Sequence, residues 1–145
     1  MSTVRHLLQI KGADVWVITP GASVYDALRL MADKDIGALL VVENDKLVGI
    51  ISERDYARKI ILHGKSSKDT LVKEIMTPKL ITVHPDQTVN ECMELMSNHH
   101  IRHLPVVLDG EVLGVISIMD VVRDIIYQQR QTIKSLEQKL GKSED

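Results

Sequence analysis

The sequence predicts an α+β fold made of two copies of one β-α-β-β-α unit, packed through their sheets as a pseudo-twofold module. A repeat is the first observation: residues 20–58 reappear as residues 85–123, at a constant offset of 85 − 20 = 65. The second is that short β-type runs alternate with helical apolar stripes inside each copy. A tandem repeat of this size predicts clefts between the copies, where function is expected.

Composition supports a globular protein with an aliphatic core. The chain has 145 residues, 44% of them hydrophobic, a net charge of −2 and no Phe. The charge balance argues against a general nucleic-acid binder, and no apolar run is long enough to cross a bilayer. The N-terminal residues show no signal-peptide pattern, which predicts a cytoplasmic protein. Cys92 is the single cysteine; it suits a reducing compartment and lies on an apolar stripe, which predicts a buried thiol.

The first copy is preceded by a short leading helix over residues 3–10, which Gly12 ends. Apolar runs of strand length predict strands over residues 15–19, 38–42 and 47–52. Ser23 is a predicted N-cap for a helix that Gly37 breaks, and Asn44-Asp45 is a predicted hairpin turn. A further helix is predicted from residue 53 to about 62.

The second copy repeats this order after a polar loop over residues 65–70 and one helical turn at 72–76. Strands are predicted over residues 80–83, 103–108 and 112–117, with a hairpin turn at Asp109-Gly110. Helices are predicted from Thr88 and from about Ile118. The domain organisation is therefore a lead-in (1–15), repeat 1 (16–64), a linker (65–79), repeat 2 (80–124) and a helical extension (125–145).

The extension carries apolar side chains at seven-residue steps. Ile126, Ile133 and Leu140 follow this spacing, with Leu136 between them. This pattern predicts either a short coiled-coil seam between two chains or packing of the helix onto the body of the protein.

Each copy ends its hairpin with the same motif, Gly-h-h-Ser-x-x-Asp, where h is hydrophobic. It covers Gly49 to Asp55 and Gly114 to Asp120. Ser followed three residues later by an acid is typical of a helix N-cap. Because the acid recurs at the start of two equivalent helices, it is also placed to accept hydrogen bonds from the two hydroxyls of a ribose, while the helix N-terminus favours phosphate.

The paired motif, together with Ile101-Arg102-His103-Leu104-Pro105-Val106, resembles a tandem CBS-domain pair, or Bateman module, of the small stand-alone bacterial type. The resemblance implies a non-catalytic regulatory module that binds AMP, ADP, ATP, NAD or S-adenosylmethionine between its repeats, with AMP favoured here. It also implies a homodimer and an unidentified regulated protein. The alternative is an interaction or dimerisation module without a ligand, in which Ser-x-x-Asp is only a cap.

The resemblance also implies roles for individual residues. Asp55 and Asp120 would hold ribose hydroxyls, with Ser52 and Ser117 beside them. The residues implied along the adenine are Ile18, Thr19, Thr82, Val83, Ile36, Ile101 and Pro105. Those implied at the phosphate are Arg54, Arg102 and His103, all serving the cleft of Asp55.

The two clefts are therefore expected to differ. The cleft of Asp120 has Gly37-Ala38 where the other has Arg102-His103, and Ile118-Met119 where the other has Glu53-Arg54. It has little positive charge for a phosphate, and Met119 would narrow it.

Other candidates carry less weight. His99, His100 and His103 are not expected to converge on a metal ion. Arg58 and Arg123, one helical turn beyond the two acids, are expected to form local ion pairs with them. Trp16 either covers an adenine or packs on the leading helix. No nucleophile–base pair or phosphate-binding glycine loop is found, so no enzymatic activity is expected.

Overall fold

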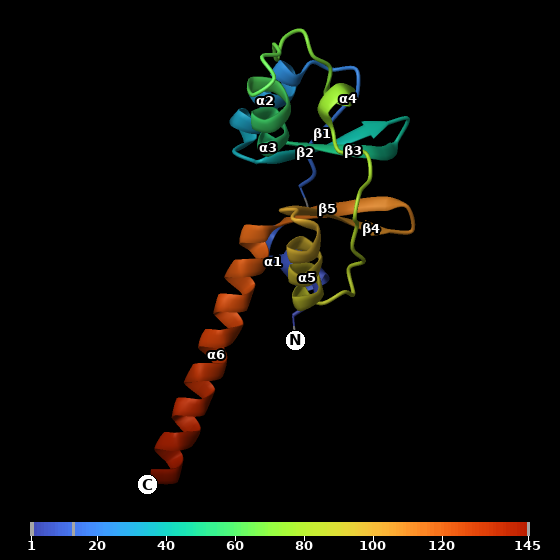
Figure 1. The fold of residues 1–145 in the computed structure, drawn as a ribbon. Coiled ribbons are helices and arrows are strands. Elements are labelled where there is room, and N and C mark those ends of the chain that lie inside the picture. Colours follow the sequence, from blue (N-terminus) through green and yellow to red (C-terminus); the bar gives the residue numbers. More distant parts are fainter. Residues whose placement is uncertain (1, 13, 145) are drawn as a thin grey trace. The chain divides into compact units, whose positions relative to one another are not determined.

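A computed structural model describes residues 2–12 and 14–144, with the backbone alone for 142–144. Residues 1 and 145, the outer limits of the predicted lead-in and extension, lie outside the described residues. The chain is α+β and forms two compact units (Figure 1). The repeat-1 unit is Asp14–Ile81, and the repeat-2 unit joins Met1–Ala13 to Thr82–Asp145.

The repeat-1 unit contains a three-stranded sheet in the order β1-β2-β3. Its strands are β1 (Val17–Ile18), β2 (Ala38–Glu43) and β3 (Lys46–Ser52). Its helices are α2 (Val24–Lys34), α3 (Glu53–Tyr56), the π-helix η1 (Ala57–Ile61) and α4 (Val72–Ile75). The buried core lies between the sheet and these helices and includes Met31, Leu39 and Ile60.

The repeat-2 unit contains the hairpin of β4 (His103–Leu108) and β5 (Glu111–Ser117). Its helices are α1 (Val4–Lys11), α5 (Val89–His99) and α6 (Ile118–Glu144). Its buried side chains include Leu7, Met96, Leu104 and Cys92. Cys92 is a buried core thiol as predicted, and burial, followed by the charge of Glu91, raises its pKa to about 11.

The two hairpins have the same register and the same irregularity. Ala38 pairs with Ser52 in the first, and His103 pairs with Ser117 in the second. A β-bulge lies between Val41 and Val42 and again between Val106 and Val107. In each unit the serine therefore lies at the end of the hairpin, directly before the following helix.

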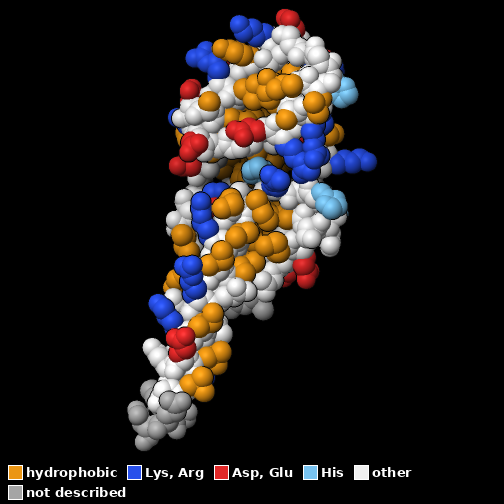
Figure 2. All heavy atoms as spheres, turned by 60° about the vertical axis from the view of Figure 1, so that its left-hand side comes forward, with side chains coloured by type: hydrophobic (Ala, Val, Ile, Leu, Met, Phe, Trp, Pro, Cys, Tyr) orange, Lys and Arg blue, Asp and Glu red, His pale blue; other side chains and the backbone are white. Residues whose placement is uncertain are grey.

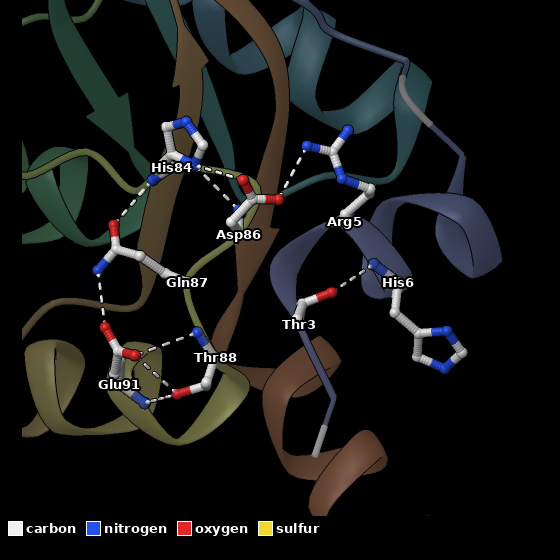
Figure 3. A network of polar contacts seen from close by, with 8 residues as sticks. All are labelled: Thr3, Arg5, His6, His84, Asp86, Gln87, Thr88 and Glu91. Carbon is white, nitrogen blue, oxygen red and sulfur yellow. Dashed lines mark hydrogen bonds and ion pairs between the residues drawn. The ribbon is translucent and has the colours of Figure 1, made fainter.

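Helix α1 belongs to the repeat-2 unit, although 70 residues of chain separate Lys11 from Thr82. Val4 donates its backbone N–H to the carbonyl of Gln87 (2.9 Å), and Val89 donates to Ser2 (3.0 Å). Figure 3 shows the side-chain contacts around this junction, including an ion pair between Arg5 and Asp86 at 2.9 Å. These contacts fasten α1 to the segment that leads into α5.

Helix α4 takes the place of α1 in the repeat-1 unit. Val24 donates to the carbonyl of Thr70 (2.8 Å), and Val72 donates to Ala22 (2.8 Å), in the same reciprocal pattern. The two helices correspond at an offset of 72 − 4 = 68 residues, not 65. Over the eight positions of α1, only Val4 and Lys11 are identical to residues at that offset. The equivalence is therefore one of structure and is nearly invisible in the sequence.

Two glycines allow these helices to approach the hairpins. A Cβ atom at Gly49 would lie 2.7 Å from the sulfur of Met76, which follows α4, and 3.1 Å from the carbonyl oxygen of Thr77. A Cβ atom at Gly114 would lie 2.7 Å from a methyl carbon of Leu8 in α1. Both strands need glycine because a neighbouring segment passes directly over them.

The predicted strand over residues 80–83 is wrong. The structure has only an isolated bridge between Val83 and Val106. In the repeat-1 unit the N–H of Leu40 donates to the carbonyl of Trp16. The residue equivalent to Leu40 is Pro105, which has no N–H to donate, so the ladder shortens.

One helix end and the type of one helix also differ from the predictions. Helix α2 ends at Lys34 instead of Gly37, because Asp35 adopts the left-handed conformation (φ 53°) and caps it. Asp is one of the few residues besides glycine that adopts this conformation readily. The helix predicted from 53 to 62 widens into a π-helix after Tyr56, and the local sequence, which has no Pro or Gly there, does not explain this.

Helix α6 extends past the rest of its unit (Figure 1). Every side chain from residue 126 to 141 is exposed, and apolar side chains follow the helix toward its C-terminal end (Figure 2). Packing of this segment onto the body of the protein, one of the two alternatives, is therefore not observed. None of the helices in the described part of the chain has an apolar stretch that would span a bilayer.

Candidate functional site

Each Ser-x-x-Asp motif forms a reciprocal cap where a hairpin enters a helix. In the repeat-1 unit, Asp55 donates its N–H to Ser52 Oγ (3.2 Å), and Ser52 donates its N–H to Asp55 Oδ2 (2.9 Å). In the repeat-2 unit, Asp120 donates to Ser117 Oγ (3.3 Å), and Ser117 donates to Asp120 Oδ2 (2.8 Å). The capping interpretation is confirmed in both copies.

The two acids take their cations from different places. Lys59, one turn further along the same helical segment, places its Nζ 3.2 Å from Asp55 Oδ1 and donates to the carbonyl of Ile75 at 2.8 Å. Lys11, at the end of α1, donates to Asp120 Oδ2 at 2.6 Å and to the carbonyl of Val115 at 2.7 Å. Each lysine thus joins its acid to a neighbouring element.

The environment of Asp120 lowers its pKa. Burial alone raises the pKa, but the hydrogen bond and charge of Lys11, with the hydrogen bonds from Ser117, outweigh it. Asp120 therefore carries its negative charge at neutral pH. Lys11 is a cation beside this acid that the sequence did not indicate, and it is already paired with the carboxylate. That the cleft of Asp120 has little positive charge for a phosphate stays a prediction.

Sequence reasoning missed Lys11, since it lies outside the repeated segment. It also expected ion pairs from Arg58 and Arg123, and within the described residues neither arginine pairs with Asp55 or Asp120. Lys59 and Lys11 form those pairs instead. At Asp55 the partner had a local signal, the four-residue spacing of Asp55 and Lys59 on one helix face. At Asp120 no comparable signal existed.

The carboxylates also differ in the oxygen that stays available. At Asp55, Ser52 occupies Oδ2 and Lys59 contacts Oδ1. At Asp120, Ser117 and Lys11 both bind Oδ2, and no described residue donates to Oδ1. A ligand hydroxyl would meet a vacant acceptor at Asp120 and a half-exposed lysine at Asp55.

Comparison with known proteins decides the family. The CBS-domain family matches this chain twice, over residues 6–62 and 72–127. The chain is a CBS-domain protein. The first match runs from α1 into repeat 1, whereas the structure places α1 against repeat 2, so the CBS repeats are contiguous in sequence but exchange their leading helix in space.

Relatives of this CBS-domain protein occur in plants and bacteria. The CBS domain-containing protein CBSX3, mitochondrial, of Arabidopsis thaliana is 43% identical over an alignment of 144 residues, with 93% of this chain and 70% of that protein covered. A putative signal-transduction protein with CBS domains from Burkholderia ambifaria has a solved structure with 49% identity and a TM-score of 0.85. That similarity covers 88% of this chain and 96% of that one.

A third structure bears on ligands. The CBS domain pair of protein MJ0100, solved in complex with 5′-methylthioadenosine and S-adenosyl-L-methionine, is 28% identical with a TM-score of 0.78. The structural similarity covers 88% of this chain and 98% of the MJ0100 chain. At least one CBS pair of this fold therefore binds adenosine compounds.

The residues predicted along an adenine lie at the strand edges of the two CBS units. In the repeat-1 unit, Ile18 ends β1, Thr19 follows it exposed, and Ile36 precedes β2. In the repeat-2 unit, Val83 and Pro105 are buried and joined by a backbone hydrogen bond of 2.9 Å. Thr82 is exposed there, and Ile101 is half-buried.

The residues predicted at a phosphate belong to different CBS units. Arg54 is half-buried in α3 of the repeat-1 unit. Arg102 is exposed just before β4 of the repeat-2 unit, and His103 is half-buried at the first position of that strand. Their convergence on the cleft of Asp55 stays a prediction.

The structure also describes the surroundings of Trp16 and of the candidate metal-binding histidines. Trp16 stacks under the ammonium group of Lys34, 4.3 Å from the ring centroid, and this contact was not among the predicted alternatives. In the described part of the chain no three His, Cys, Asp or Glu side chains are grouped closely enough for a metal ion.

Proposed function

We propose that this CBS-domain protein is a cytoplasmic, non-catalytic sensor of adenosine nucleotides, with AMP as the favoured ligand and NAD or ATP as alternatives. Asp55 and Asp120 accept the ribose hydroxyls. The observation that carries the proposal is the pair of equivalent carboxylates, each fixed by a serine at the N-terminus of a helix. The adenosine ligands of the MJ0100 domain pair support it.

The chemistry of each carboxylate fits this role. The reciprocal cap fixes the rotamer of the acid, so little side-chain entropy is lost when a ligand binds. Hydrogen bonds from two vicinal hydroxyls to one charged group are stronger than neutral ones. The first turn of α3 or α6 adds a partial positive field that favours phosphate.

The two sites are unequal in this proposal. The Asp55 site combines with Arg54, Arg102 and His103, and binds the phosphorylated end of a nucleotide tightly. Each acid also contacts a lysine, Lys59 at Asp55 and Lys11 at Asp120, so the difference lies in the phosphate-binding residues, which the Asp120 site lacks. Met119, which is exposed, adjoins the acid. The second site is therefore the weaker one.

Calorimetric titration with AMP tests the proposal, followed by NAD, ATP and S-adenosylmethionine. Asp55→Asn keeps an acceptor for the cap but removes the charge, and we expect it to weaken AMP binding by about tenfold or more. Asp120→Asn is expected to have a smaller effect. Ser52→Ala and Ser117→Ala keep the acid but lose the cap that orients it, which lowers stability by about 1 kcal/mol, so they separate the effect of the cap from that of the charge.

The outcomes separate the alternatives. Equal losses in the two Asp→Asn variants would remove the asymmetry. The absence of any heat or thermal shift with every adenosine ligand would favour an interaction module in which Ser-x-x-Asp is only a cap.

The second part of the proposal is a homodimer joined through the exposed segment of α6. Ile133, Leu136 and Leu140 are each more than half exposed, although helices in proteins owe most of their stability to packing of an apolar face. A second copy supplies an identical apolar stripe at the same seven-residue spacing. The ligand then acts by favouring one arrangement of the dimer or of the repeats, which an unidentified regulated protein reads.

Sedimentation equilibrium of the full chain tests this seam. Leu136→Asp places a charge in the stripe and is expected to shift the protein toward monomer by about tenfold or more in dissociation constant. Lys134→Asp, two residues away on a different face, is the control and should leave the dimer intact. A monomeric wild-type protein, or equal effects of both variants, would contradict the seam.

A further inference from the structure

A pocket lies between α1 and α6 inside the repeat-2 unit. The proposed nucleotide function uses Asp120 at its edge and gives no role to most of its other lining residues. The volume of the pocket is about 540 Å³, within the usual range for small-molecule sites. Three residues of α1 and four of α6 line it: Leu7, Ile10, Lys11, Asp120, Arg123, Asp124 and Tyr127. The α6 residues recur at the three- and four-residue spacing of one helix face.

Asp124 is the acidic group of this pocket. The residue is 7% exposed, and within the described part of the chain its carboxylate has neither a hydrogen bond nor an ion pair. No fully buried side-chain oxygen in that part lacks a partner, so the carboxylate oxygens of Asp124 reach solvent in the pocket that the residue lines. They are therefore open to a donor that a ligand brings.

The other unit shows what a structural residue does at this position. The residue equivalent to Asp124, at 124 − 65 = 59, is Lys59, which binds Asp55 and the carbonyl of Ile75. In the repeat-2 unit Lys11 has taken over the contact with the acid. Position 124 is therefore not needed to pair with Asp120, and it carries an acid where the repeat-1 unit has a lysine.

Arg123 supplies an opposite charge in the same pocket. Its side chain is exposed, and within the described residues it forms no ion pair, because Lys11 already neutralises Asp120 at 2.6 Å. The pocket thus presents one unpaired acid and one unpaired base. The rest of the lining consists of the apolar side chains of Leu7 and Ile10, the ring of Tyr127, and the Lys11–Asp120 ion pair.

We propose that this pocket binds a free amino acid with an apolar side chain, in its zwitterionic form. The ammonium group donates to the carboxylate of Asp124. The carboxylate of the ligand accepts two hydrogen bonds from the guanidinium of Arg123. The apolar side chain of the ligand packs on Leu7, Ile10 and Tyr127. The proposal does not depend on nucleotide binding, because none of these five residues belongs to the proposed nucleotide sites.

Calorimetric titration of the full chain with L-leucine, L-methionine and L-phenylalanine tests it. We expect saturable binding of at least one. Two derivatives of that amino acid each lack one charge: the N-acetyl form cannot donate an ammonium to Asp124, and the amide has no carboxylate for Arg123. Each is expected to bind about tenfold more weakly or worse, since a charged hydrogen bond contributes about 1.5–3 kcal/mol.

Protein variants provide the second arm. Asp124→Asn should weaken the parent amino acid but not its N-acetyl form, and Arg123→Gln should weaken the parent but not its amide. Arg123 is exposed, so its variant keeps the fold even if Asp124→Asn does not. Arg58→Gln, the equivalent exposed position in the repeat-1 unit, is the matched control and should leave the affinity unchanged.

Three results would overturn the proposal. These are no saturable binding of any of the three amino acids, equal affinity for the parent and both derivatives, and binding that neither Asp124→Asn nor Arg123→Gln changes. If a second copy of the chain fills the pocket, Asp124→Asn alters the dimer dissociation constant while no amino acid binds, and this also counts against it. AMP titration of Arg123→Gln, expected to match the wild type, keeps this test separate from that of the nucleotide sites.

Discussion

The repeat-1 and repeat-2 units hold the same carboxylate in the same cap but neutralise it differently. Asp55 is paired with Lys59 of its own helical segment, and Asp120 is paired with Lys11 of a helix distant in sequence. In one unit the lysine reaches toward α4, and in the other it comes from α1. The two caps therefore keep the same backbone geometry, while the lysine that pairs with the acid comes from the helix after the cap in one unit and from α1 in the other. Because Lys11 makes this pair in the repeat-2 unit, position 124, the equivalent of Lys59, is available for another role.

The glycines beneath α4 and α1 give the largest expected difference between the units. Gly49→Ala brings a Cβ atom against the sulfur of Met76 and the backbone oxygen of Thr77. Thr77 is held in place because its N–H donates to the carbonyl of Ile50 and its carbonyl accepts from the N–H of Ile50. We expect a loss of about 2–3 kcal/mol in the free energy of unfolding. Gly114→Ala meets only the side chain of Leu8, which can rotate away, so the loss is expected to be about 1 kcal/mol.

Urea unfolding followed by circular dichroism measures both variants. Equal losses of unfolding free energy in the two variants would mean that the Leu8 side chain cannot move away any more easily than the Thr77 backbone. The contacts over Gly49 and Gly114 would then tolerate an added methyl group equally.

The lysines give the next effect. Lys11→Met leaves Asp120, whose side chain is 13% exposed, without its cation and is expected to lower the free energy of unfolding by about 1–2 kcal/mol. Lys59→Met removes a longer contact from a more exposed lysine, so about 0.5 kcal/mol is expected. The unfolding free energies are compared at low ionic strength. A larger loss for Lys59→Met would reverse our ranking of the two ion pairs.

The pH dependence of the Lys11 contact is the smallest expected effect. Because the pKa of Asp120 is lowered in the folded protein, the unfolded chain binds its proton more readily. The stabilisation is fully present above the unfolded pKa, about 3.9, and is lost as pH falls through the folded pKa. The difference in unfolding free energy between the wild type and Lys11→Met should therefore shrink below about pH 4. A difference independent of pH would show that Lys11 acts through the carbonyl of Val115 alone.

Local rules made most of the fold predictable. The hairpins, their turns, the N-cap at Ser23 and the start of a helix near Thr88 follow from patterns within a few residues, and the structure confirms them. The strand at 80–83 was mispredicted because its pairing depends on an N–H that Pro105, more than twenty residues away, does not have. Asp35 was missed as a helix end because the more obvious Gly37 stands two residues further on.

The sequence by itself determined the repeated unit, the CBS resemblance and the two Ser-x-x-Asp caps, because these depend on periodicity and on contacts three residues apart. Only the tertiary structure decided that α1 packs with repeat 2, that Lys11 neutralises Asp120, and that Asp124 lines a pocket between α1 and α6. Such contacts join residues separated by about a hundred positions, and no local pattern encodes them. They arise from which surfaces bury each other once the chain is folded.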